Sequence, residues 1–305
     1  MYDLVILGGG PAGLTAGIYA ARARLKTCLV ERGMPGGLAA TTETIENYPG
    51  FPGGVSGSEL MLRFQQQAEK LGVEFRTGEV EEVNLDAKVK QIHVGKELIE
   101  AKAVILATGS KPKQLGVPGE ADLYGQGVSY CATCDGAFFR NKQVIVVGGG
   151  DAAVDEAQFL TRFADKVTIV HRRREFRAAQ ISLERAKANP KIEFYTNAVV
   201  ESIIGDNLVE AVAVKDVHDG QVTKLPAQGV FVYVGNEPNT KFLSGKVELS
   251  AQGYIKVDTR LHTSLSGVFA AGDVRDTPLR QVSTAVGDGA VAAMEAERFL
   301  AAAEA

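Results

Sequence analysis

The sequence has few cysteines, no dense block of one charge and no long apolar run, and each absence excludes a class of protein. Three cysteines in 305 residues are too few for a disulfide-stapled secreted scaffold. The net charge of −4 and the lack of an extended basic block argue against a nucleic-acid-binding surface. No apolar run is long enough to span a membrane, and no signal-peptide pattern precedes the first expected strand. The sequence therefore predicts a cytoplasmic, globular protein that binds neither nucleic acid nor membrane.

The sequence does contain a strand–helix–strand pattern that occurs twice. Residues 4–31 form the first such unit and residues 143–171 the second, and a glycine-rich loop follows the first strand of each. Units of this kind build parallel sheets covered by helices. The prediction is an α/β fold with two doubly wound, Rossmann-like nucleotide-binding domains.

Proline-containing linkers near residues 112–119 and 236–240 mark the expected domain boundaries. A strand ending at Asp273 and a helix from about residue 283 to residue 300 return the chain to the first domain, with residues 301–305 expected to fray. The second domain is therefore expected to be inserted in the first. The predicted limits are residues 1–113 and 241–305 for the first domain and residues 114–240 for the second.

The first glycine loop has the residues that a dinucleotide site needs. Gly8 permits the tight turn after the strand, Gly10 lets a pyrophosphate approach the backbone, and Gly13 lets the helix pack on the strand. The helix N-terminus then favours the anion. Glu31 ends the second strand, where an acid accepts ribose hydroxyls and repels a 2′-phosphate. This loop therefore predicts FAD or NAD, not NADP.

The second glycine loop repeats the pattern with a different ending. Gly148 and Gly150 are followed by Ala153, an accepted variant at the third position. Its second strand ends in a basic cluster, which suits a phosphate and favours NADP over NAD. The alternative is a solvated basic turn. The cluster consists of His171, Arg172, Arg173, Arg174 and Arg177.

Cys131 and Cys134 are separated by two residues, a spacing that permits either a redox disulfide or half of a zinc site. A zinc site needs further ligands, and the histidines are scattered without ligand spacing. Cys28 lies within an apolar strand pattern and is expected to be a buried small hydrophobe. The pair is therefore predicted to be redox-active, with no metal. Asp135 follows directly, either as an acid–base group or as a solvated loop residue.

With these motifs, the chain resembles the low-molecular-weight thioredoxin reductases of the bacterial type over essentially its whole length. The resemblance implies FAD in the first domain, NADPH in the inserted domain, thioredoxin as the protein substrate and a homodimer. The residues that carry it are Gly8, Gly10, Pro11, Ala12 and Gly13; Asn47; Thr108 and Gly109; Cys131, Cys134 and Asp135; Gly148, Gly150, Asp151 and Ala153; His171, Arg172, Arg173 and Arg177; and Asp273, Arg280 and Gln281.

The resemblance also implies roles for individual residues. Cys134 is the cysteine that faces the flavin, Cys131 attacks the partner disulfide, and Asp135 is the acid–base group. Asp273 binds the ribityl chain, and Arg280 and Gln281 lie near the isoalloxazine. His171, Arg172, Arg173 and Arg177 form the 2′-phosphate site, and the family pattern does not fix the position of Arg174. Two positions depart from the family pattern. Leu38 stands where the family usually has a glutamine that contacts flavin, and Gln126 stands where some relatives have a basic residue implicated in partner docking.

In the implied relay, electrons pass from NADPH through FAD to the cysteine pair and on to thioredoxin. The cysteine pair and the NADPH loop share one domain, so a rotation about the two linkers is expected to bring each to the flavin in turn. Alternative readings are a dithiol oxidase of the same fold, a reductase fed by ferredoxin and a non-catalytic redox sensor. The arginine cluster argues against the first two readings, because neither of those enzymes needs NADPH.

Overall fold

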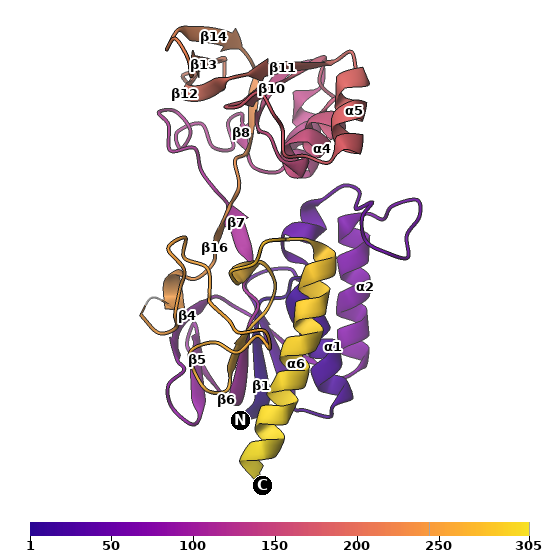
Figure 1. Ribbon diagram of the computed structural model, residues 1–305, viewed down its shortest axis with the longest axis vertical. Coiled ribbons are helices and arrows are strands. Elements are labelled where there is room, and N and C mark those ends of the chain that lie inside the picture. Colours follow the sequence, from indigo (N-terminus) through magenta and orange to yellow (C-terminus); the bar gives the residue numbers. More distant parts are fainter. Residues whose placement is uncertain (244, 305) are drawn as a thin grey trace. The chain divides into compact units, whose positions relative to one another are not determined.

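The computed structural model describes residues 1–243 and 245–304, without the side chain of Glu304. The chain divides into two compact units (Figure 1). The first comprises Met1–Lys111 and the segment from Glu237 to the C-terminus, and the second comprises Pro112–Asn236. The second unit is thus inserted in the first. The α/β fold with two Rossmann-like units is confirmed.

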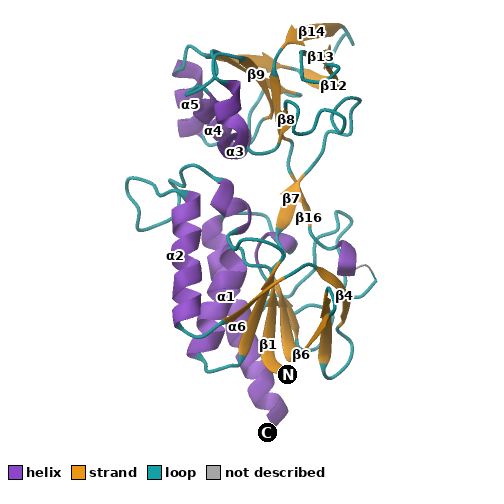
Figure 2. Ribbon diagram, turned by 180° about the vertical axis from the view of Figure 1, so that it is seen from behind, coloured by secondary structure: helices purple, strands orange, loops and turns teal. Residues whose placement is uncertain are grey.

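The first unit is built on a seven-stranded sheet of order β3-β2-β1-β6-β5-β4, with β17 paired to β6. Successive side chains of a strand point to opposite faces of the sheet, so alternate residues belong to two hydrophobic cores, one on each face. Leu4 and Ile6 pack with the helices, and Val5 and Leu7 pack on the other face. Helices α1, α2 and α6 form one layer against this sheet (Figure 2). The strands are β1 Tyr2–Leu7, β2 Thr27–Glu31, β3 Glu74–Thr77, β4 Val80–Asn84, β5 Lys90–Val94, β6 Glu97–Leu106 and β17 Val268–Ala270, and the helices are α1 Pro11–Arg22, α2 Gly57–Lys70 and α6 Val282–Glu304.

The second unit has a five-stranded parallel sheet of order β11-β10-β9-β15-β8. One face packs on α4 and α5, and the other packs on a three-stranded antiparallel sheet, β12-β13-β14. The strands are β8 Val128–Ser129, β9 Gln143–Gly148, β10 Lys166–His171, β11 Ile192–Thr196, β12 Ala198–Ile204, β13 Ala211–Asp216, β14 Val222–Pro226 and β15 Gly229–Tyr233, and the helices are α3 Ala132–Asp135, α4 Asp151–Leu160 and α5 Gln180–Ala188.

The two linker segments pair with each other as a short two-stranded sheet, β7 (Ser110–Pro112) with β16 (Asn236–Pro238). Short one-turn 3₁₀ segments complete the fold, among them η1 (Gly37–Thr41), η2 (Gly136–Phe139), η3 (Lys241–Leu243) and η4 (Gly272–Val274). Among the described residues, no helix combines the length and the apolar content that a membrane crossing requires.

The observed fold differs from the sequence-based expectation in three places. The first sheet is mixed, because β5 runs antiparallel to both of its neighbours, β4 and β6. The meander β12–β14 was not expected at all, since its short alternating strands carry no glycine fingerprint. Helix α6 continues to Glu304, so residues 301–304 are helical, and Ala305 lies outside the described residues.

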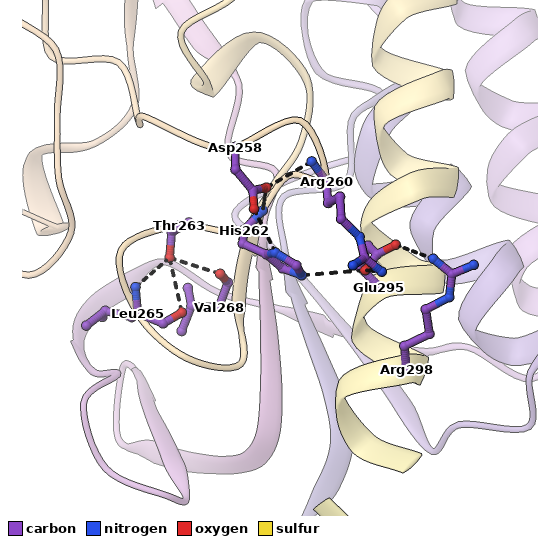
Figure 3. Close-up of polar contacts among 8 residues, drawn as sticks. All are labelled: Asp258, Arg260, His262, Thr263, Leu265, Val268, Glu295 and Arg298. Atoms are coloured by element: carbon purple, nitrogen blue, oxygen red, sulfur yellow. Dashed lines mark hydrogen bonds and ion pairs between the residues drawn. The ribbon is translucent and has the colours of Figure 1, made fainter. Parts of the chain in front are cut away.

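A buried carboxylate anchors the C-terminal half of α6 (Figure 3). The Glu295 side chain is 6% exposed and pairs with Arg260 at 2.7 Å and with Arg298 at 2.5 Å. The His262 ring lies between two acids, with Nδ1 2.9 Å from Asp258 and Nε2 3.5 Å from Glu295. The helix that follows the Asp273 segment is thereby fixed to the loop that precedes β17.

Candidate active site

In the first unit, the loop after β1 is shaped by close backbone contacts. Gly8 has φ +107°, a conformation that favours glycine. A Cβ on Gly13 would lie 1.8 Å from the carbonyl oxygen of Gly8, so helix α1 packs directly on the loop. By contrast, a Cβ on Gly10 would meet no atom within 4 Å. Nothing in the protein itself requires glycine there, as expected if a ligand approaches that backbone.

Glu31 lies at the end of β2, beside this loop. Its carboxylate accepts hydrogen bonds from the backbone N–H of Gly9 at 2.7 Å and from that of Gly33 at 3.3 Å. A carboxylate has about four acceptor positions, so it retains capacity for the hydroxyls of a ribose. The predicted acid is therefore placed at the end of the strand next to the loop.

Further predicted residues of the first unit make hydrogen bonds to distant segments of the chain. The Thr108 hydroxyl donates to the Asn239 carbonyl at 2.9 Å, and the Asn239 amide donates to the Thr108 carbonyl at 2.9 Å. The Asn47 amide donates to Gln281 at 3.0 Å. Segments more than 100 residues apart in sequence are thus joined near the predicted flavin-contacting residues.

Asp273 and Arg280 are half-buried charged groups near the end of this unit's predicted flavin-contacting segment. Burial raises the pKa of Asp273, and the Arg280 charge lowers it in part. The Arg280 guanidinium lies 3.9 Å from the centre of the Tyr254 ring, and its buried Nε has no hydrogen-bond partner within the described residues. A buried donor without a partner is costly, which suits a site completed by a polar ligand. The residues present therefore fit FAD.

The second unit repeats the loop geometry after β9. A Cβ on Gly150 would meet no atom within 4 Å, and Ala153 is fully buried beneath the loop. Asp151 accepts a hydrogen bond from the Ala179 backbone N–H at 2.7 Å, and the Arg177 backbone N–H donates to Gly149 at 2.8 Å. The segment that carries the arginines is thus tied to the loop at two points.

The basic cluster after β10 divides between the interior and a surface pocket. His171 is buried, and its ring packs 4.9 Å from that of Phe176; burial lowers the pKa of His171. Arg177 is exposed and does not line the pocket. The pocket has a volume of about 500 Å³ and is lined by Arg172, Arg173, Arg174, Glu175, Asn197, Val217 and His218.

The same unit carries the cysteine pair, which is closed as a disulfide between Cys131 and Cys134. Cys134 is exposed and Cys131 is half-buried. The Ser129 hydroxyl donates to the Asp135 carboxylate at 2.7 Å and accepts from the Cys131 backbone N–H at 3.0 Å. The Ser129 hydrogen bond thus holds the Asp135 carboxylate beside the cysteine pair. Within the described chain, no cluster of three or more histidine, cysteine or acidic side chains is arranged to hold a metal.

Three residues near these sites were missed in the sequence. The Tyr233 hydroxyl accepts a hydrogen bond at 2.8 Å from the backbone N–H of Ala132, between the two cysteines. Burial, and to a lesser extent the charge of Glu156, raises the pKa of Tyr233 far above its ordinary value, so the hydroxyl keeps its proton. Ser129 could have been found by its place two residues before Cys131. Tyr233 and His218 carry no sequence signal of their own.

Comparison with known proteins agrees with this geometry. Residues 2–289 match the family described as pyridine nucleotide-disulphide oxidoreductase. A thioredoxin reductase of Mycolicibacterium smegmatis is 51% identical over 99% of this chain and 97% of its own length. The crystal structure of Lactococcus lactis thioredoxin reductase is 44% identical and superposes with a TM-score of 0.97, covering 99% of this chain and all of that one.

One similar structure carries a different name. A ferredoxin-flavin thioredoxin reductase of Clostridium acetobutylicum is 31% identical, with a TM-score of 0.54, and the match covers 99% of this chain and 98% of that one. Its lower identity places it further from this chain than the relatives above. The chain belongs to the pyridine nucleotide-disulphide oxidoreductase family and, within it, to the thioredoxin reductases of the low-molecular-weight bacterial type.

Proposed function

We propose that this protein is an NADPH-dependent flavoprotein that reduces the disulfide of thioredoxin. The single observation that carries the proposal is the make-up of the second unit. One compact unit holds a disulfide flanked by a fixed carboxylate and a glycine loop followed by arginines. A disulfide that turns over needs a supply of electrons, and the arginines select a phosphate-bearing nicotinamide as the source.

The first unit supplies the flavin site in this proposal. The loop from Gly8 to Gly13 takes the pyrophosphate and Glu31 the ribose. By the family resemblance, Asp273 would bind the ribityl chain, and Arg280 and Gln281 would lie near the isoalloxazine. The Asn47 amide donates a hydrogen bond to Gln281. When bound there, FAD would pass two electrons from NADPH to the disulfide. The proposal places FAD in the domain of residues 1–113 and 241–305 and NADPH in the domain of residues 114–240.

The cysteines then carry out thiol–disulfide exchange. The Cys131 thiolate attacks the partner disulfide, forms a mixed disulfide and releases one partner thiolate. The Cys134 thiolate next attacks the Cys131 sulfur, which restores the internal disulfide and releases the second partner thiolate. Asp135, oriented by Ser129, exchanges protons with the dithiol. A cytoplasmic homodimer is part of the same proposal and rests on the family resemblance.

The test is anaerobic oxidation of NADPH by the FAD-loaded protein in the presence of a bacterial thioredoxin. We expect turnover in the wild type and none in C134S, whereas C28S should retain it, because Cys28 is fully buried in the other unit. If NADPH fails to bleach the flavin but reduced ferredoxin does, the ferredoxin-fed alternative replaces the proposal. Bleaching by a small dithiol with transfer to oxygen would favour an oxidase instead.

A further inference from the structure

The turn between β13 and β14 is held against the end of β11. The Val217 backbone N–H donates to the Asn197 carbonyl at 2.8 Å. Within the turn, one carboxylate oxygen of Asp216 accepts from the backbone N–H groups of His218 at 2.7 Å and Asp219 at 3.3 Å. His218 therefore lies in a turn of the antiparallel meander that is held both by its own hydrogen bonds and by a hydrogen bond to the segment after β11.

This turn lies beside the arginines because of the strand order. Strands β10 and β11 are parallel neighbours, and His171 is in register with Thr196. The residues that follow each strand therefore emerge at the same edge of the sheet. Arg172 to Arg174 follow one strand and Asn197 follows the other, and together with Val217 and His218 they line the pocket of about 500 Å³.

The side chains around this pocket are mainly positively charged, and their charges are not neutralised by ion pairs with the protein's own acids. No ion pair involves Arg172, Arg173 or Arg174 in the described part of the chain. The acids nearby are Glu175 on the pocket wall and Asp216 and Asp219 in the turn. Three arginines and one histidine thus surround a space that is open to an anion.

We propose that His218 is a specificity-determining residue that recognises the 2′-phosphate of NADPH together with the arginines. The inference rests on the NADPH dependence in the proposed function and extends it to a turn about 45 residues beyond the arginines in sequence. A histidine ring can donate a hydrogen bond to a phosphate oxygen, and the arginine guanidiniums beside it supply further, bidentate donors.

The test compares two probes that each carry two phosphate groups and differ in the position of one of them. Adenosine 2′,5′-bisphosphate, which has a 2′-phosphate, and ADP, which has none, are titrated calorimetrically into the FAD-loaded wild type, H218Q, R173A and H93Q at pH 6.5. His93 is an exposed histidine on β5 of the other unit and serves as the matched control. We expect H218Q to reduce the affinity for the bisphosphate about three- to tenfold and the affinity for ADP by less than about twofold, because a hydrogen bond to the 2′-phosphate is lost.

The remaining variants define the outcomes. R173A should also reduce the affinity for the bisphosphate, whereas H93Q should leave it unchanged. The inference about His218 is overturned if H218Q binds both probes with wild-type affinity or loses affinity for both probes equally. In either case, the proposed NADPH dependence still holds if the wild type prefers the bisphosphate and R173A loses that preference. If the wild type does not prefer the bisphosphate to ADP, the NADPH dependence fails and the inference fails with it.

Discussion

The hydroxyl of Tyr233, at the end of β15, accepts a hydrogen bond from the backbone N–H of Ala132 at 2.8 Å. Ala132 lies between the two cysteines and is fully buried, so this N–H has no access to water. The hydrogen bond therefore fixes the backbone of the cysteine segment to the central sheet of its unit. It spans 101 residues of sequence.

Replacing Tyr233 by phenylalanine should lower the free energy of unfolding by about 1–3 kcal/mol, because a buried donor loses its partner. Urea unfolding of the oxidised protein measures this change. Y195F is the matched control, since the Tyr195 hydroxyl makes no hydrogen bond within the described residues. Equal stability of Y233F and the wild type would contradict the argument.

The Ser129–Asp135 hydrogen bond leads to a prediction about exchange kinetics. D135N should slow reduction of thioredoxin by the pre-reduced enzyme about 100-fold, within the usual range for loss of an acid–base group. S129A should give a smaller loss, because the carboxylate remains but is less well oriented. Stopped-flow measurement distinguishes them, with S202A on β12 as a control of the same chemistry. An S129A rate equal to that of the wild type would show that the serine does not orient the acid.

A largely buried ion pair holds the Asp273 segment. Arg275 meets Asp288 on α6 through two contacts, at 2.5 and 2.9 Å, and Asp288 also accepts from the Gly272 backbone N–H at 3.0 Å. The two side chains are only 18% and 13% exposed. The pair therefore joins the turn that carries Asp273 to the C-terminal helix.

Removing one charge of this pair should weaken both the fold and FAD binding. D288N is expected to lower the free energy of unfolding by about 3 kcal/mol, since a buried charge is left unpaired. FAD release, followed by flavin fluorescence, should show affinity reduced about tenfold, equivalent to about 1.4 kcal/mol. The exposed pair Lys256–Glu248 provides the control, and E248Q should change neither quantity. Unchanged FAD affinity in D288N would show that the ion pair does not contribute to flavin binding.

The cluster around Glu295 predicts a pH dependence of stability. Burial alone raises the pKa of Glu295, but the hydrogen bonds and charges of Arg260 and Arg298 outweigh it and hold the pKa below its ordinary value. A carboxyl with a depressed pKa in the folded state stabilises the fold above its unfolded pKa of about 4.3. That contribution is lost as the pH falls through the folded value.

Melting temperatures measured from pH 7 down to pH 3.5 test this sign. E295Q should melt below the wild type at pH 7, and the difference should shrink as the pH falls below about 4.3. E82Q, at an exposed position on β4, should follow the wild-type curve throughout. A difference that grows on acidification would reverse the assigned direction of the pKa shift.

The two nucleotide units, the redox-type cysteine pair and the family are predictable from the amino-acid sequence. Each of these is encoded locally: strand, glycine loop and helix lie within about 30 residues, so periodicity and steric requirements at Gly8 and Gly13 specify them without knowledge of distant contacts. The antiparallel meander β12–β14 was missed for the converse reason, since short alternating strands are specified mainly by their packing partners.

Only the tertiary structure decided which distant residues complete each site. Tyr233 reaches Ala132 because β15 lies beside β8 and β9, and His218 joins Arg172 to Arg174 because β10 and β11 end at one edge. Asp288 meets Arg275 through the packing of α6 on the Asp273 turn. These contacts depend on strand order and helix packing, which side-chain identity along the chain does not encode locally.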